Sequence, residues 1–300
     1  MFIKNIPDNL NQSSIIVGDA LKILRQIPSE SVQSVITSPP YWGMRDYEMA
    51  GQIGAESDLI EYLDSLISVF REVKRVLKID GTLWINIGDG YTSGNRKYRA
   101  SDKKNPARQM QNRPDTPEGL KPKDLIGIPW RLAFALQQDG WYLRSDIIWH
   151  KPNAMPESVH DRPNRNHEYL FMFSKSEKYY FNSDALIENG KRRRSVWEVP
   201  IKKNALKHNA VFPPDLISPC VQSCTEKPGD MVLDPFFGSG TVGFVCEKYN
   251  RNYIGIELNP AYANVALTRL KNVSATINNF DRTASIEAVK VEFSGLKQAI

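Results

Sequence analysis

The sequence predicts an α/β fold, a doubly wound and mostly parallel sheet with helices on both faces. Short apolar runs typical of buried strands alternate with stretches of helical periodicity. Strands separated by helices pair in parallel through right-handed crossovers. The 300 residues are 41% hydrophobic and 24% charged, which is typical of a globular chain rather than a disordered or membrane-embedded one.

The first third of the chain supplies three strand candidates and one clear helix. Residues 15–17 and 32–37 are apolar runs that stop at turn residues. From Ser57, a candidate N-cap, apolar residues recur every three or four positions to residue 77, which predicts one long amphipathic helix. The dipeptide Asp80-Gly81 then predicts a turn, which is followed by a strand over 82–87.

The middle third contains one helix between two irregular stretches. We expect loops over residues 91–123 and 151–167, which lack apolar periodicity and are rich in charge and proline. Order resumes with a helix over 124–138, followed by three strands. These strand predictions cover residues 141–149, 169–173 and 178–181.

The last third is the most regular part of the sequence. We expect helices from residue 214, after 240 and from 260, with strands at 231–233 and 253–256. We interpret residues 1–300 as one domain carrying two basic insertions, 91–123 and 153–206. The residues after Asn272 match no motif.

The basic residues are concentrated in two stretches. The net charge is +5, and residues 91–123 hold nine basic residues against three acidic ones. A second cluster begins at Lys191-Arg192-Arg193-Arg194. This placement favours a polyanionic partner, although many such runs are solvated loops.

The spacing of the cysteines and the lack of an export signal predict a cytoplasmic protein. Residues 1–14 lack the apolar stretch and the cleavage site that export requires, so we expect a cytoplasmic protein. No apolar run is long enough to span a membrane. Cys220, Cys224 and Cys246 have no metal-binding spacing, so we expect buried, reduced thiols. The four histidines are scattered, and we expect no metal site.

A glycine-rich turn follows the strand at 231–233. Gly238, Gly240 and Gly243 fit the spacing GxGxxG, and Glu257 ends the next strand about twenty residues later. A carboxylate there can hold the ribose hydroxyls of any adenosine-containing cofactor, so a nicotinamide-dependent oxidoreductase fits these residues too. A turn that serves packing alone is a third possibility.

Asp234 favours a different ligand. An acid just before the turn repels a pyrophosphate but suits a ligand that carries an amino group and a sulfonium, as S-adenosylmethionine does. No lysine follows the turn in the manner of a phosphate-binding P-loop.

A second motif, Thr37-Ser38-Pro39-Pro40-Tyr41-Trp42, follows the strand at 32–37. Its prolines remove two N–H donors and hold the preceding residues in an extended conformation. The polar groups that remain in the turn are hydrogen-bond acceptors. The Pro39 carbonyl and the Ser38 hydroxyl can accept both hydrogens of a primary amine, so that the nitrogen lone pair points at a methyl donor. Tyr41 offers a flat face for a nucleobase.

With these motifs the chain resembles a permuted (beta-class) DNA amino-methyltransferase, and it is most similar to the N4-cytosine-specific members of bacterial or phage restriction-modification type. The resemblance covers residues 15–270 and is carried by TSPPYWGMRDY, DPFFGSGT and GIELNPAY. It implies the Rossmann-like fold of S-adenosylmethionine-dependent methyltransferases, a single catalytic domain, and extrusion of the target base from duplex DNA.

The resemblance also implies roles for individual residues. The expected catalytic residues are Ser38, Pro39, Pro40 and Tyr41. The expected cofactor residues are Asp19, Phe212, Asp234, Phe236, Gly238, Ser239, Gly240 and Glu257. In a DNA methyltransferase we expect the 91–123 loop to follow DNA phosphates, through Arg96, Lys97, Arg99, Lys103 and Lys104. We expect the 153–206 region to read base edges, with Asn153, Arg162, Arg165, Arg193 and Trp197 as candidates.

Several functional questions stay open at this level. Serine before the Pro-Pro-Tyr sequence favours cytosine N4 in the family, but adenine N6 is an alternative target. A non-catalytic DNA-binding relative is another alternative. We interpret Cys220 as a buried thiol rather than the nucleophile of carbon-5 methylation. The expected partner is double-stranded DNA, with a cognate restriction endonuclease possible and the protein a monomer or a homodimer.

Overall fold

The structure is a computed structural model that describes residues 12–47, 49–93, 113–201, 212–277 and 287–289. Within these residues nine strands form one sheet in the order β11-β1-β10-β9-β2-β3-β5-β4-β8. The strands of this sheet are β1 (Ser14–Val17), β2 (Val32–Thr37), β3 (Leu77–Ile87), β4 (Tyr142–His150), β5 (His167–Ser174), β8 (Val196–Glu198), β9 (Met231–Asp234), β10 (Asn252–Glu257) and β11 (Glu287–Val289). A separate hairpin pairs β6 (Ile187–Glu188) with β7 (Lys191–Arg192).

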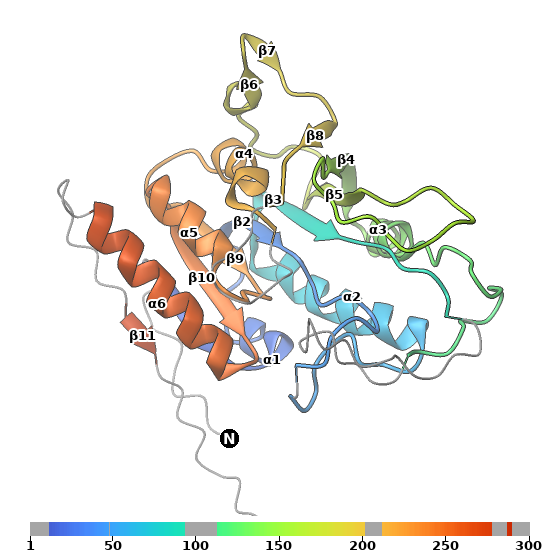
Figure 1. Cartoon of the computed structure of the whole chain (residues 1–300). Coiled ribbons are helices and arrows are strands. Elements are labelled where there is room, and N and C mark those ends of the chain that lie inside the picture. Colours follow the sequence, from blue (N-terminus) through green and yellow to red (C-terminus); the bar gives the residue numbers. More distant parts are fainter. Residues whose placement is uncertain (1–11, 48, 94–112, 202–211, 278–286, 290–300) are drawn as a thin grey trace, which may run out of the picture.

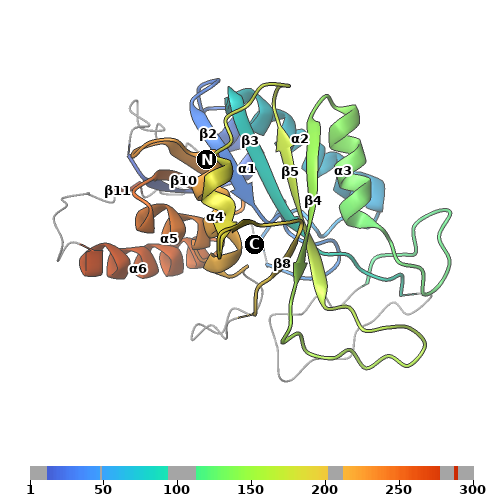
Figure 2. The ribbon, with the colours of Figure 1, turned by 90° about the horizontal axis from the view of Figure 1, so that it is seen from above.

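Helices cover both faces of the sheet, as predicted. They are α1 (Ala20–Leu24), α2 (Leu59–Val76), α3 (Ile128–Gln138), α4 (Pro214–Cys224), α5 (Thr241–Lys248) and α6 (Pro260–Ile277), with a 3₁₀ turn η2 (Ser183–Leu186). Helices α1, α2 and α3 pack on one face, and α4, α5 and α6 pack on the other (Figures 1 and 2). The sheet therefore separates two hydrophobic clusters.

The sheet is parallel except around β5. β5 runs antiparallel to both β3 and β4, whereas the pairs β1–β10, β9–β10, β2–β9 and β2–β3 are all parallel. Because β5 is reversed, its first residues lie at the edge where the parallel strands end. The sequence did not indicate this reversal.

Most predicted elements are confirmed, with four local corrections. The N-cap of α2 is Asp58 rather than Ser57, because the Asp58 carboxylate accepts from the Ile60 amide at 2.7 Å. The turn predicted at 80–81 is wrong, because β3 passes through Gly81 and the adjacent pairing with β2 shifts register. The predicted strand at 178–181 is also absent: only the Tyr180 amide reaches the neighbouring Asp80 carbonyl, at 2.9 Å. Helix α3 begins at Ile128 rather than at 124, after Gly127 in a left-handed conformation.

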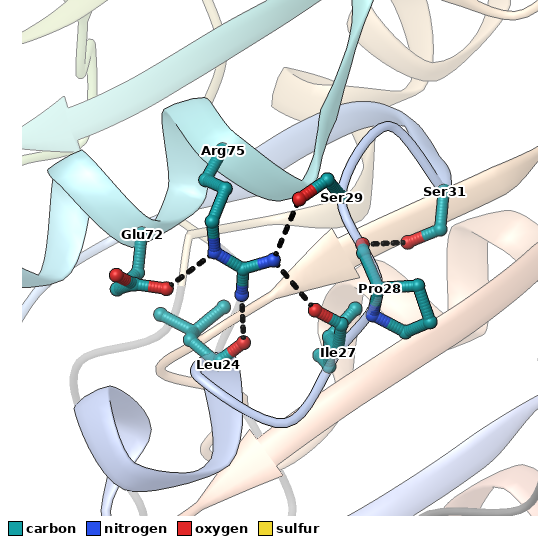
Figure 3. A network of polar contacts seen from close by, with 7 residues as sticks. All are labelled: Leu24, Ile27, Pro28, Ser29, Ser31, Glu72 and Arg75. Atoms are coloured by element: carbon teal, nitrogen blue, oxygen red, sulfur yellow. Dashed lines mark hydrogen bonds and ion pairs between the residues drawn. The ribbon is translucent and has the colours of Figure 1, made fainter.

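Arg75 in α2 fixes the connection between α1 and β2 (Figure 3). Its guanidinium donates to the carbonyls of Leu24 and Ile27 at 2.7 and 2.9 Å, and to the Ser29 hydroxyl at 3.1 Å. Glu72 accepts from its Nε at 2.7 Å. The Leu24 carbonyl also accepts from the Ile27 amide at 3.0 Å. The helix end and the following loop are therefore anchored to α2 through carbonyl groups at the end of α1.

The two predicted insertions are described in part. Residues 94–112, the centre of the first, lie outside the described residues. The second, 153–206, includes β5, which lies inside the main sheet between β3 and β4. It also contains η2, the β6–β7 hairpin and β8, and the hairpin projects from the body of the fold in Figure 1. In the ranges that the structure describes, no helix combines the length and apolarity needed to cross a membrane.

Candidate functional site

The carboxyl ends of β1, β2, β9 and β10 meet at one edge of the sheet, because these strands are mutually parallel. A cavity of about 380 Å³ opens there. It is lined by most of the predicted catalytic and cofactor residues: Asp19, Ser38, Pro39, Pro40, Tyr41, Phe212, Asp234, Phe236, Gly238, Ser239 and Glu257. The two motifs thus share one cleft, as a parallel α/β sheet allows.

A direct hydrogen bond joins the two motifs. The Thr37 hydroxyl donates to Oδ1 of Asp234 at 2.6 Å, and the Phe236 amide donates to the same oxygen at 3.0 Å. Burial raises the pKa of Asp234 to about 7, and the charge of Glu257 adds to this rise, while the two donors oppose it. A cation placed beside this carboxyl group would favour its ionised form.

Glu257 holds the glycine-rich turn in place. Its Oε2 accepts from the Gly238 amide at 2.7 Å and its Oε1 from the Asn259 amide at 2.8 Å. Burial raises the pKa of this carboxyl group, and the backbone donors oppose the rise. Each oxygen keeps a second lone pair, so the carboxylate can still accept from a bound hydroxyl.

The two phenylalanines of the turn have different positions. Phe236 is half-buried and lines the cavity, whereas Phe237 is buried and stacks on Tyr253, with 5.7 Å between ring centroids. Phe237 lies directly over Gly255, where a Cβ would be 2.3 Å from the ring. The glycine of β10 therefore makes room for the ring beneath the turn.

Ser239 and Gly240 also differ from each other. The Ser239 hydroxyl is buried, lines the cavity and has no hydrogen-bond partner in the described structure. Gly240 does not line the cavity; it precedes α5 with φ of 76° and packs against Ala266. Its position supports a role in shaping the turn. The sequence alone did not distinguish this role from contact with the ligand.

The Pro-Pro-Tyr turn is fixed by its neighbours. The Tyr62 hydroxyl donates to the Pro40 carbonyl at 2.8 Å, and the Tyr41 hydroxyl donates to Oε2 of Glu168 at 2.8 Å. Burial, and next the charge of Glu168, raise the pKa of Tyr41 well above its ordinary value. Tyr41 is therefore a neutral phenol held by its hydroxyl at the cavity wall.

Asp19 lines the cavity from the end of β1, but its carboxylate also caps α1. Oδ1 accepts from the Lys22 amide at 2.9 Å. Because one carboxylate oxygen suffices for this cap, the other can still accept from a ligand.

Three charged residues that line the cavity were given no role from the sequence: Arg45, Lys151 and Glu168. Lys151 and Glu168 line the cavity and form an ion pair, and the Lys151 ammonium lies 4.2 Å from the centre of the Trp149 ring. Glu168 was hidden because its position depends on the reversal of β5. Lys151 is the first residue after a strand end, which is the one signal that could have drawn attention to it.

The predicted DNA-binding residues are only partly described. Arg96, Lys97, Arg99, Lys103 and Lys104 lie outside the described residues. Within the described part, Arg162 pairs with Glu157 at 2.5 Å and lies over the Tyr91 ring. Arg193 pairs with Glu188 at 3.1 Å and lies over the Trp197 ring. The Arg165 amide donates to Glu157 at 3.2 Å.

Two further candidates for base contacts have structural roles. Trp197 is 2% exposed and belongs to the core, so the prediction of a base contact there is wrong. The Asn153 side chain makes two 2.8 Å hydrogen bonds with the backbone of Ile201. This pairing ties the 151–166 segment to a residue that lines the cavity.

The three cysteines are buried and free, as predicted. Burial raises the pKa of the Cys220 thiol well above its ordinary value, which opposes formation of a nucleophilic thiolate. Within the residues that the structure describes, no group of three histidine, cysteine or acidic side chains is placed to bind a metal ion.

Comparison with known proteins agrees with this geometry. A family described as DNA methylase matches residues 32–268. The type II methyltransferase M.Cfr9I from Citrobacter freundii is 62% identical over 276 residues, which are 90% of this chain and 92% of that protein. M.SmaI from Serratia marcescens, also a type II methyltransferase, is 54% identical over 88% of this chain and 93% of its own length.

Solved structures share the fold. The PvuII DNA methyltransferase, a cytosine-N4-specific enzyme, superposes with a TM-score of 0.66 at 21% identity, covering 92% of this chain and 98% of that one. The putative DNA modification methylase TTHA0409 from Thermus thermophilus, complexed with S-adenosyl-L-methionine, has a TM-score of 0.60 at 26% identity, covering 87% and 95%.

Proposed function

Because the chain belongs to the N6/N4 DNA methylase family, we propose that it transfers a methyl group from S-adenosylmethionine to the exocyclic N4 of a flipped cytosine in duplex DNA. The observation that carries this proposal is the shared cavity, in which the Thr37–Asp234 hydrogen bond places the Ser-Pro-Pro-Tyr turn beside the glycine-rich turn. Family membership gives the nicotinamide-dependent alternative no support.

The residues present fit S-adenosylmethionine. The buried Ser239 hydroxyl without a partner would meet a polar group of the ligand, and Asp234 would meet a cationic one. Glu257 would accept from the ribose hydroxyls with its remaining lone pairs, and Asp19 and Phe212 would flank the adenine. When bound, this cofactor supplies an electrophilic methyl group.

The chain's own part in the transfer is orientation. The Ser38 hydroxyl and the Pro39 carbonyl accept the two amino hydrogens of the base, so the nitrogen lone pair is directed toward the cofactor side of the cavity. Tyr41 would stack on the base, and its ring is held by the hydrogen bond to Glu168. No covalent bond to the protein is needed, in keeping with the buried and protonated cysteines.

Cytosine is supported over adenine by two observations. Serine precedes the two prolines of the motif, and the PvuII methyltransferase that shares the fold is cytosine-N4-specific. Adenine N6 is the alternative within the same family. The site of action would be the cytoplasm of a bacterial or phage-infected cell, and a cognate endonuclease would be the natural partner of a type II enzyme.

Mass spectrometry of nucleosides tests the proposal. DNA from a host that expresses the protein is digested, and we expect N4-methylcytosine that is absent when Ser38→Ala is expressed. Detection of N6-methyladenine alone would overturn the base assignment. If the expressed protein is soluble and binds S-adenosylmethionine but the DNA contains neither methylated base, the proposed activity is contradicted.

A further inference from the structure

Lys151 and Glu168 are brought to the cavity by the reversed strand β5. Lys151 is the first residue after β4, Glu168 is the second residue of β5, and Trp149 pairs with Glu168 across the two strands. Because β5 is antiparallel to β3 and β4, its beginning lies where those strands end. Both side chains line the cavity that Ser38 lines.

The two side chains and Tyr41 form a connected chain of polar contacts. The Tyr41 hydroxyl donates to Oε2 of Glu168 at 2.8 Å, and Oε1 of Glu168 accepts from the Lys151 ammonium. The ammonium also lies over the Trp149 ring. The lysine and glutamate side chains are 14% and 19% exposed.

Fold stability gives a poor reason for this arrangement. A largely buried ion pair gains little net free energy, since the loss of hydration offsets the attraction between its charges. An ammonium carries three N–H donors, and among the described residues Lys151 uses one, toward Glu168. Two donors remain at the wall of a cavity that faces the catalytic motif.

The chemistry of the two candidate bases makes such donors selective. Cytosine presents two adjacent acceptors beside its amino group, N3 and O2. Adenine presents one acceptor, N1, and then a C–H group that a donor gains nothing from contacting. Enzymes that extrude a base read it through hydrogen bonds to this edge. A pair of N–H donors that reaches both positions therefore favours cytosine, because a donor at N3 alone would meet N1 of adenine equally well.

Glu168 makes a cation acceptable at this place. The amino nitrogen of the base gains positive charge as it takes a methyl group, so an unpaired ammonium nearby would slow the transfer. Paired with Glu168, the lysine contributes donors while the pair carries no net charge.

We propose that Lys151, oriented by Glu168, donates hydrogen bonds to the N3 and O2 edge of the target cytosine and so contributes to the choice of base. This inference rests on the proposed function and adds a specificity-determining residue to that site. Glu168 is a positioning residue that acts through Lys151 and Tyr41.

Base analogues in the target position test the contact. After the methylated site has been mapped, single-turnover methylation is measured on duplexes with cytosine, with 3-deazacytosine, which lacks N3, or with 2-aminopyridine, which lacks O2. The proteins are the wild type, Lys151→Met and Lys151→Met/Glu168→Gln. The double variant leaves no unpaired buried carboxylate. Lys74→Met is the matched control, because its ammonium also lies near a tryptophan, Trp141, but lines no part of this cavity.

We expect both Lys151 variants to methylate cytosine roughly 10- to 100-fold more slowly, as for a lost base contact, and Lys74→Met to match the wild type. At least one analogue should slow the wild type about tenfold and produce no further loss in the double variant. If each analogue slows methylation by the same factor in the wild type and in the double variant, the inference about Lys151 is overturned. The proposed function is not affected by that result, because the wild type still methylates cytosine. Methylation of adenine alone by the wild type would overturn the proposed function as well.

Discussion

The Thr37 hydroxyl donates a 2.6 Å hydrogen bond to the Asp234 carboxyl group across a separation of 197 positions in sequence. Thr37 is the last residue of β2 and Asp234 the last of β9, and these strands are parallel neighbours. Both partners are buried, at 0% and 2% exposure. The bond therefore fixes the two functional turns relative to each other at the bottom of the cavity.

Replacing Thr37 by valine tests this coupling. Thr37→Val keeps the shape but removes a donor from a buried carboxyl group, which costs about 1–3 kcal/mol of unfolding free energy. We expect that loss in urea unfolding, together with weaker binding of S-adenosylmethionine by calorimetry. Thr37→Ser, which keeps the hydroxyl, is the control. If the Thr37→Val and Thr37→Ser proteins bind S-adenosylmethionine equally well, the hydrogen bond does not organise the site.

The pKa of Asp234 predicts a dependence of stability on pH. The value rises from 3.8 to about 7 on burial, so between these values the folded state keeps a proton that the unfolded state has released. The Asp234 contribution to stability is therefore complete below about pH 4, falls as the pH rises, and is lost above about 7.

Urea unfolding of Asp234→Asn at pH 5 and pH 8 measures this effect. Asparagine does not ionise, so its unfolding free energy should change less between the two pH values than that of the wild type. A parallel pH dependence in both proteins would show that other groups are responsible. Glu257, whose pKa is also raised by burial, is present in both proteins and contributes to the pH dependence of each.

The sequence predicted the architecture and most of the site because those features depend on local patterns. Apolar periodicity located β2 and β10, and the turns after β2 and β9 lie at the predicted edge of the sheet. The parts that failed depend on pairing between distant segments. Nothing local shows that β5 is reversed, and so nothing local could place Glu168 beside Tyr41. Likewise, Trp197 looked like a surface contact residue until β8 added to the edge of the sheet.

The packing of Phe237 predicts a severe effect at Gly255. A methyl group there would lie 2.3 Å from the Phe237 ring. Gly255→Ala should therefore lower the unfolding free energy by about 1–3 kcal/mol or more through overpacking. Combining it with Phe237→Ala should give a smaller total loss than the sum of the two single losses, measured by urea unfolding. Simple additivity would mean that the ring and the methyl group do not meet.

Two arginines of α2 should differ in their importance. Arg75 donates to two carbonyls and a hydroxyl and is 33% exposed, whereas Arg71 forms a surface pair with Asp139 and is 63% exposed. We expect Arg75→Met to cost about 2 kcal/mol of unfolding free energy, because the Ile27 carbonyl loses its donor and the Leu24 carbonyl keeps only the Ile27 amide. Arg71→Met should cost at most about 1 kcal/mol. Equal losses in thermal or urea unfolding would contradict the anchoring role.

The β6–β7 hairpin allows structural and DNA-contacting arginines to be told apart. Arg193 is half-buried, paired with Glu188 and stacked over Trp197, whereas Arg194 is exposed. Under the proposed function, Arg194 contacts a phosphate. Arg194→Gln should then lower DNA affinity and reduce the slope of log affinity against log salt by about one, because one fewer counterion is released.

Arg193→Gln should instead lower the unfolding free energy with little change in the salt slope, since its charge is already paired within the hairpin. Filter binding between low and physiological potassium chloride, alongside urea unfolding, measures both quantities on the same preparations. A reduced slope for Arg193→Gln and an unchanged one for Arg194→Gln would reverse the assignment. The half-buried arginine would then exchange its carboxylate for a phosphate when DNA binds, and Glu188 would be a partner of the free protein only.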